Sequence, residues 1–421
     1  MRRGPALALA AAAAALVLGT GLATPVRAAA ATGASPVPAA PPALHATAAA
    51  LLDADTGQLL YGHNAQRPLA IASTTKLMTA LITLERVPLS AVFADPNFYF
   101  APGDSQIALI PGERMTVHDL LLALLLPSAD DAAADLAYNI GGHSIARFLT
   151  LMNARAAQLG LTRTHYTTPS GLDTPGNYST AADLVKLARY VMRTQPFFRR
   201  AVALTHARLR SGDHPRLIVN RNDLVGRFSW INGIKTGHTL RAGYVLVGSG
   251  TRNGMTLISV VLGTSSEAER DAATLALLRW GFANFVRRTV IAAGAAVSRV
   301  PVRYRPHNPA RVLAGASFTR VLARRAVVRT RALLPRQVAG PLPRGARVGT
   351  LLILSGGRVI GRVPLVLAAR LAAASPGVSL ASLAAPITLV SAVLLALIAA
   401  VAGGFGRKRT RGRAAEGPKR Q

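Results

Sequence analysis

The 421-residue sequence contains no cysteine. This absence excludes a cysteine nucleophile and thiolate zinc sites, and it leaves the stability of the fold to the hydrophobic core rather than to disulfides. The nine histidines show neither a His-Glu-x-x-His string nor another metal-ligand spacing, and there is no phosphate-binding Gly-x-x-x-x-Gly-Lys string. The sequence therefore predicts neither a metal ion nor a cofactor.

Acidic residues are scarce. The chain has 18 Asp and Glu against 49 Lys and Arg, a formal net charge of +31, and residues 287–370 carry 17 arginines but no Asp, Glu or Lys. Such a segment favours anionic partners. We expect anionic lipid head groups or wall polymers rather than nucleic acid, because the chain lacks a nucleic-acid recognition motif and is predicted to be exported. Solvated arginines without a specific ligand remain the alternative.

The beginning of the chain has the pattern of a signal peptide. Two arginines at residues 2–3 precede an apolar run at residues 6–23, and small residues at positions 28–30 suit an A-x-A cleavage site. We predict that residues 1–30 are a signal peptide, with an uncleaved anchor as the alternative. Residues 31–44, rich in Ala, Pro, Gly and Ser, are predicted to be a flexible linker.

A long apolar run near the other end predicts a transmembrane helix. Residues 383–405 are 23 residues without a charge, about 34 Å as a helix, which is enough to cross a hydrocarbon core of about 30 Å. The run has no charged face of the kind that an interfacial amphipathic helix needs. The basic tail at residues 406–421 is expected in the cytoplasm, which places the part of the chain before the span on the outer side of the cell membrane.

Between these ends, the pattern of apolar and turn residues predicts two folded parts. Residues 45–285 are expected to form an α/β domain, with hairpins near its two ends and helices between them. Residues 286–370, short Val-rich and Leu-rich runs broken by prolines, are expected to form a small all-β domain whose clearest hairpin spans residues 351–366. The hairpins of the first domain are predicted at residues 46–62 and 243–262, and its helices at residues 74–87, 117–126, 131–138, 143–159, 180–192 and 266–285.

Three short motifs follow one another in the first domain: Ser-x-x-Lys at residues 73–76, Ser-Ala-Asp at residues 128–130 and Lys-Thr-Gly at residues 235–237. Each motif alone is weak, but the ordered set is typical of a serine acyl-transferase. A serine hydroxyl needs a base to become a nucleophile, and Lys76 lies three residues after Ser73, on the same helix face. Burial and a second positive charge at Lys235 would lower the pKa of Lys76 and so favour its role as that base.

The sequence around these motifs resembles the D-alanyl-D-alanine carboxypeptidases, which are low-molecular-mass penicillin-binding proteins. The resemblance covers residues 46–285 well and residues 286–370 more loosely. It implies a penicillin-binding protein/β-lactamase-like catalytic domain, with one sheet built from both ends of the domain, followed by a β-sandwich that holds it away from the membrane. It also implies removal of the terminal D-alanine of peptidoglycan stem peptides through an acyl-enzyme on Ser73, and acylation of Ser73 by penicillins and other β-lactams. The matching segments are residues 52–57, 72–81, 125–133, 169–173 and 232–239.

The resemblance also implies roles for the other motif residues. Ser128 would carry a proton between Lys76 and the leaving amine, and Lys235 with Thr236 would hold the terminal carboxylate of the substrate. Gly237 would let the substrate backbone approach the strand closely.

Two further positions complete the implied site. The backbone N–H groups of Ser73 and His238 would form the oxyanion hole, while the His238 ring faces solvent. Arg270 would bind a carboxylate, although a surface ion pair with Glu267 is its alternative role.

Asp130 departs from the family pattern, which has Asn at this position. A carboxylate between Lys76 and Lys235 would accept hydrogen bonds from both and donate none, and it would favour the charged form of Lys76. Slower acylation or a different pH optimum is the expected consequence. The alternatives to a carboxypeptidase are a catalytically weak penicillin-binding scaffold, a D,D-endopeptidase and a β-lactamase.

Overall fold

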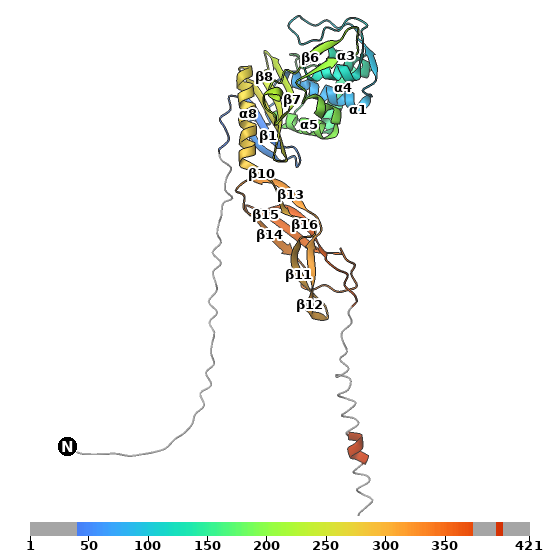
Figure 1. Cartoon of the computed structure of the whole chain (residues 1–421), viewed down its shortest axis with the longest axis vertical. Helices are drawn as coiled ribbons and strands as arrows, with labels where there is room; N and C mark the ends of the chain where they lie inside the picture. The colour runs from blue at the N-terminus through green and yellow to red at the C-terminus, as the bar shows by residue number, and fades with distance from the viewer. Residues whose placement is uncertain (1–39, 374–392, 399–421) are drawn as a thin grey trace, which may run out of the picture. The chain divides into compact units, whose positions relative to one another are not determined.

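The computed structural model describes residues 40–373 and 393–398. Its first part is built on a five-stranded antiparallel sheet in the order β2-β1-β9-β8-β7 (Figure 1). The strands come from the two ends of this part, as expected, with the helices contributed between them. They are β1 (Ala48–Asp53), β2 (Leu59–His63), β7 (Ile231–Thr239), β8 (Gly243–Arg252) and β9 (Met255–Thr264).

Helices cover both faces of this sheet. Alternate residues of β1 point to opposite faces. Ala50 and Leu52 therefore pack with the helices that follow β2, whereas Ala49 and Leu51 pack with α8, on the other face (Figure 1). The helices are η1 (Ala72–Thr75), α1 (Lys76–Arg86), α2 (Val117–Leu125), α3 (Asp130–Ile140), α4 (Ile145–Gln158), α5 (Ala181–Thr194), α6 (Pro196–Ala201), α7 (Leu224–Arg227) and α8 (Glu267–Asn284).

Most of the predicted helices are confirmed within a few residues, and local signals explain where they begin. The Thr180 hydroxyl accepts a hydrogen bond from the Asp183 N–H at 3.1 Å, so Thr180 caps the start of α5. The predicted hairpin turn between β8 and β9 has Asn253 and Gly254 at positive φ, the conformation that such a turn requires. The Lys-Thr-Gly motif, which the sequence pattern predicts at the start of a sheet edge, instead lies in the middle of the edge strand β7.

Two short hairpins extend from the helical side of this part. One pairs β3 (Val92–Ala94) with β4 (Arg114–Thr116), and the other pairs β5 (His206–Leu209) with β6 (Arg216–Val219). The long segment between β3 and β4 contains residues 103–109, which form part of the site described below.

The second part is all-β in the residues that the structure describes, as predicted. The predicted boundary after residue 285 lies at the junction where α8 leads directly into β10, without a linker. The predicted hairpin at residues 351–366 is the β15–β16 pair. The strands form a two-stranded sheet, β10-β13, and a five-stranded sheet, β11-β12-β16-β15-β14, from β10 (Phe285–Ile291), β11 (Ala296–Val302), β12 (Arg305–Ala314), β13 (Phe318–Ala323), β14 (Val328–Leu333), β15 (Arg347–Ser355) and β16 (Arg358–Leu367).

Several predictions fall largely outside the described residues. The signal peptide at residues 1–30 and the tail at residues 406–421 lie wholly outside them. Of the linker at residues 31–44, only residues 40–44 are described, and of the span at residues 383–405, only the helical residues 393–398. Among the helices that the structure describes, none has the length and apolar character needed to cross a membrane.

Candidate active site

Ser73 lies in the short helical turn η1, directly before α1. The predicted helix is therefore divided, with the serine in a 3₁₀ turn and the lysine at the first residue of the α-helix. Two glycines let neighbouring segments approach this turn closely. A Cβ on Gly171 would lie 2.0 Å from the Ala72 carbonyl oxygen, and one on Gly237 would lie 2.8 Å from the Ser73 nitrogen. The serine is thus held between strand β7 and the loop that contains Gly171.

Lys76 is fully buried beneath Ser73. Its Nζ contacts the Ser73 Oγ at 2.9 Å, the Asp130 Oδ1 at 2.5 Å and the Ser170 carbonyl oxygen at 2.7 Å. A neutral amine has two N–H donors and one lone pair. The amine could therefore donate to Asp130 and to the Ser170 carbonyl while it accepts the proton of Ser73.

The surroundings of Lys76 favour this neutral form. Burial lowers the pKa of Lys76, and the Arg221 charge lowers it further, while Asp130 and Asp131 act in the opposite direction; burial outweighs them. The pKa of Lys235, which is also buried, lies well below its usual range because of burial and the nearby charges of Lys76 and Arg221. Two lysines with depressed pKa values in one site are typical of acid-base chemistry.

Ser128 precedes α3 and has a positive φ of 72°. Such a conformation is uncommon for a serine and is found mostly where the surrounding structure imposes it. Its buried Oγ has no hydrogen-bond partner among the described residues. The hydroxyl lines the cavity beside Ser73, so it is available to a bound molecule.

One cavity of about 900 Å³ brings most of the predicted site residues together. Lys76, Asp130 and Lys235 do not line it; they are buried around it. The His238 side chain is exposed, as expected, and stacks on Tyr244 with ring centroids 4.0 Å apart. The predicted residues that line the cavity are Ser73, Ser128, Thr236, Gly237, His238 and Arg270.

Arg270 forms the ion pair that was its alternative role. Its guanidinium pairs with Glu267 at 2.7 Å and with Asp271 at 2.8 Å, so the predicted ion pair exists, yet the arginine is buried rather than on the surface. Arg270 also lines the cavity. Arg221 lies on the same cavity and was missed by the sequence analysis, because no motif or fixed spacing distinguishes it from the many other arginines.

Asp130 differs from expectation in its partners. Its Oδ1 accepts from Lys76, but its Oδ2 accepts from the backbone N–H of Ser105 at 3.2 Å. The Lys235 Nζ instead donates to the Thr236 carbonyl oxygen at 3.1 Å. The expected hydrogen bond from Lys235 to Asp130 is therefore absent from the described residues, although Asp130 still acts on Lys235 through its charge. Within the described ranges, no group of three or more His, Asp or Glu residues is arranged to hold a metal ion.

Comparison with known proteins agrees with this geometry. A family model described as D-alanyl-D-alanine carboxypeptidase matches residues 35–266. The chain belongs to this family. The resemblance predicted from the motifs is therefore confirmed. The family and its named relatives also confirm the expected serine-type carboxypeptidase activity, which is a hydrolase activity.

Relatives of known name cover both described parts of the chain. The carboxypeptidase DacC of Escherichia coli is 32% identical in an alignment of 342 positions that covers 77% of this chain and 84% of DacC. DacF of Bacillus subtilis is 29% identical in an alignment of 329 positions that covers 76% of this chain and 84% of DacF. The solved structure of penicillin binding protein 5 from Haemophilus influenzae aligns with a TM-score of 0.64 at 29% identity, over 79% of this chain and 99% of that one. The penicillin-binding α/β fold is confirmed.

Proposed function

We propose that this D-alanyl-D-alanine carboxypeptidase uses Ser73 as its nucleophile and Lys76 as the base. The observation that carries the proposal is the 2.9 Å contact between the Lys76 Nζ and the Ser73 Oγ, with Ser73 lining the cavity and Lys76 buried. The hydroxyl oxygen attacks the carbonyl carbon of the penultimate D-alanine of a peptidoglycan stem peptide, and its proton passes to Lys76. Backbone N–H groups of Ser73 and His238 stabilise the oxyanion.

Collapse of the tetrahedral intermediate breaks the carbon–nitrogen bond. Ser128 relays a proton from Lys76 to the nitrogen of the departing D-alanine, and its unpartnered hydroxyl suits that task. Water then hydrolyses the ester on Ser73 and regenerates the hydroxyl. A penicillin acylates the same oxygen through its β-lactam carbonyl.

Positive charges on one side of the cavity would bind the terminal carboxylate of the substrate. Thr236 offers a hydroxyl on β7, and Arg270 and Arg221 line the same cavity. Lys235, buried on the same strand, would become positive as the substrate carboxylate approaches, because a negative charge raises its pKa. Strand β7 is the edge strand of its sheet, so an extended peptide could pair with it. Gly237 leaves room for such a peptide because it has no side chain.

Asp130 sets the pH range in this proposal. Its charge is the strongest influence that raises the pKa of Lys76, against the lowering effect of burial. We expect that acylation requires a higher pH than it would with Asn at this position, because more of Lys76 stays protonated.

We also propose where the enzyme acts. Peptidoglycan lies outside the cytoplasm, so the signal peptide at residues 1–30 would export the chain and residues 383–405 would hold it in the cell membrane. The arginines of residues 287–370 would then face anionic lipid head groups or wall polymers.

The test uses the full-length protein in two separate assays. One assay follows covalent labelling by a fluorescent penicillin, and the other follows D-alanine release from diacetyl-Lys-D-Ala-D-Ala, each beside a Ser73→Ala variant. Labelling and release that both depend on Ser73 support the carboxypeptidase. Labelling without release supports a scaffold or an endopeptidase, rapid turnover of the penicillin supports a β-lactamase, and no labelling rejects the role of Ser73.

A further inference from the structure

Residues 103–109 form a wall of the substrate cavity through Gly103 and Ser105. Ser105 is joined to the start of α3 by two hydrogen bonds in opposite directions. The Ser105 N–H donates to the Asp130 Oδ2 at 3.2 Å, and the Asp130 N–H donates to the Ser105 carbonyl oxygen at 2.6 Å. The position of this wall is therefore coupled to the carboxylate that contacts Lys76.

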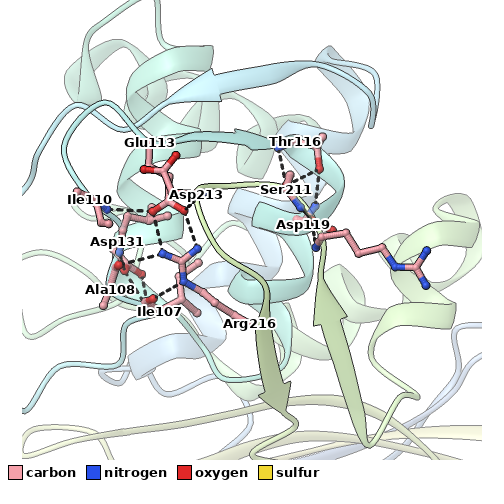
Figure 2. A network of polar contacts seen from close by, with 12 residues as sticks. Ile107, Ala108, Ile110, Glu113, Thr116, Asp119, Asp131, Ser211, Asp213 and Arg216 are labelled. Carbon is pink, nitrogen blue, oxygen red and sulfur yellow. Dashed lines mark hydrogen bonds and ion pairs between the residues drawn. The ribbon is translucent and has the colours of Figure 1, made fainter.

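The next residues of the wall are held through their N–H groups. Asp131, which follows Asp130 on α3, accepts from the Ile107 N–H at 3.0 Å (Figure 2). It also accepts from the Leu109 N–H at 3.2 Å. A carboxylate that accepts several backbone N–H groups makes charge-assisted bonds, which are stronger than neutral ones.

Arg216 holds the same residues through their carbonyl groups. Its Nε donates to the Ile107 carbonyl oxygen at 2.9 Å, and its Nη2 donates to the Ala108 carbonyl oxygen at 3.1 Å (Figure 2). Ala108 between them has a positive φ of 56°, a conformation that needs support from its surroundings. Residues 107–109 are thus fixed from two sides, by Asp131 and by Arg216.

Arg216 is in turn fixed by Glu113. The two side chains form a bidentate pair with contacts of 2.6 and 2.8 Å, and both are buried. Burial raises the pKa of Glu113, but hydrogen bonds from Arg216 and from the N–H groups of Ile110 and Asp213 outweigh it and bring the pKa down to about 2. Glu113 therefore stays ionised wherever the enzyme would work, and the pair persists.

The hairpin that carries Arg216 is anchored at its tip as well. Asp119 accepts from the Ser211 N–H at 2.8 Å (Figure 2). It also accepts from the Arg210 N–H at 2.7 Å. Gly212 allows the tip to approach closely, since a Cβ there would lie 2.3 Å from the Glu113 Oε1. The hairpin thus forms a rigid support for the Arg216 side chain.

We propose that Arg216, paired with Glu113, is a positioning residue for acylation: it holds residues 107–108 and thereby keeps Ser105 against Asp130, the partner of Lys76. This inference rests on the proposed roles of Ser73 and Lys76. Arg216 does not line the cavity of about 900 Å³, so it acts through the wall and not by touching the substrate.

Loss of Arg216 should shift the pH dependence of acylation in a predictable direction. With the wall released, Asp130 loses the N–H of Ser105 and its charge acts more fully on Lys76, which favours protonated Lys76. The acidic limb of the acylation rate should move to higher pH. The other charged groups that act on Lys76 are Asp131 on α3 and Arg221. Lys235 on β7 responds to the charge of Lys76, and the variant changes none of these three side chains directly.

The experiment measures the second-order rate constant of penicillin acylation between pH 5 and 9 for full-length wild type, Arg216→Gln, Arg216→Lys and Arg155→Gln. Arg155 pairs with Glu85 at 2.6 Å away from the cavity, so it is a matched control for the loss of a similar ion pair. We expect Arg216→Gln to acylate roughly tenfold to a hundredfold more slowly at neutral pH, because small misplacements of catalytic groups cost rates of this order. The acidic limb of its pH–rate profile should move to higher pH. Arg216→Lys should show an intermediate rate and shift, and Arg155→Gln should keep the wild-type profile.

Two outcomes would overturn the inference. One is a folded Arg216→Gln or Arg216→Lys protein with the wild-type rate and pH profile. The other needs no variant: rapid amide exchange at Ser105, Ile107 and Leu109 in the wild type would show that the wall is not held. A wild type without Ser73-dependent labelling would instead reject the proposed function itself.

Discussion

The region from β1 to α8 buries charged side chains, whereas the region from β10 to β16 keeps its charges at the surface. Lys76, Lys235 and Arg216 are among the buried charged groups of the first region, and in residues 285–373 the structure describes no buried charged or polar side chain. Burial of a charge is costly unless partners compensate for it. The comparison indicates that the first region accepts this cost where chemistry or positioning requires it, while the second gains its stability from a small apolar core.

Arg287 of the second region pairs with Asp55 at 3.0 Å, but several other arginines there donate to neutral groups. Arg324 donates to the carbonyl groups of Phe282 and Ala283 at the end of α8, where a positive charge also suits the helix dipole. Arg320 donates to the Ile360 carbonyl and to Gln58. These bonds satisfy individual guanidinium groups but leave the net charge of the region unbalanced.

The largest effect is expected from removal of the buried base. Lys76→Met should lower the rate of penicillin acylation by about 10²- to 10⁴-fold, the usual contribution of a general base. Lys186→Met is the matched control, because Lys186 is half-exposed and pairs with Asp183 at 3.3 Å outside the site. A Lys76→Met enzyme that acylates at the rate of Lys186→Met would contradict the assignment of the base.

Asp135 offers a test of buried charge in the first region that does not depend on catalysis. Burial, with the charges of Asp95 and Asp131, raises the pKa of Asp135 from 3.8 to about 7. The folded state therefore binds a proton that the unfolded state releases, and stability should fall as pH rises from about 4 to 7. Asp135→Asn should remove this loss, which is at most about 4 kcal/mol at pH 8, and should change little at pH 4.

Denaturant unfolding at pH 4 and pH 8 measures this difference. Asp104→Asn serves as a control, since Asp104 lies in a surface turn and accepts from the Ala101 N–H. If wild type and Asp135→Asn differ in stability by the same amount at both pH values, burial does not raise the pKa of Asp135.

A smaller effect, on pH dependence rather than on overall rate, is expected at Asp130. Asp130→Asn removes the charge that most strongly raises the pKa of Lys76, so that pKa should fall. The acidic limb of acylation should move to lower pH, opposite to the shift expected for Arg216→Gln. The same labelling assay measures both, and an unchanged profile in Asp130→Asn would show that the carboxylate does not control Lys76.

The residues that could be predicted from the sequence are those whose neighbours lie on the same element. Ser73 and Lys76 are three residues apart, and their contact follows from helical geometry. Thr236 and Gly237 lie together on one strand, so their common place on the cavity followed from the motif. Turn and cap residues such as Asn253 and Thr180 act locally and were equally predictable.

The remainder depends on contacts between distant segments and on backbone groups, which carry no residue-specific signal. The Ser170 carbonyl and the Ser105 N–H contact Lys76 and Asp130, yet any residue type would supply them. Arg216 and Glu113 are 103 residues apart, and nothing nearby in the sequence distinguishes this arginine from the others. These contacts become visible only once the fold brings the segments together.

The smallest effect on stability is expected at the exposed arginines of the edge strand β14. Arg329 and Arg331 are exposed, and the double change to Gln should alter the free energy of unfolding by no more than about 0.5 kcal/mol. If this surface faces anionic head groups, binding of the full-length protein to vesicles rich in phosphatidylglycerol should weaken by about 2 kcal/mol, at about 1 kcal/mol for each arginine near the surface. The matched double variant at Arg320 and Arg324 loses the same charge from groups bonded to carbonyls, so its stability should fall more than its binding. Equal vesicle binding by the wild type and the Arg329/Arg331 variant would mean that these arginines serve only to keep the edge strand soluble.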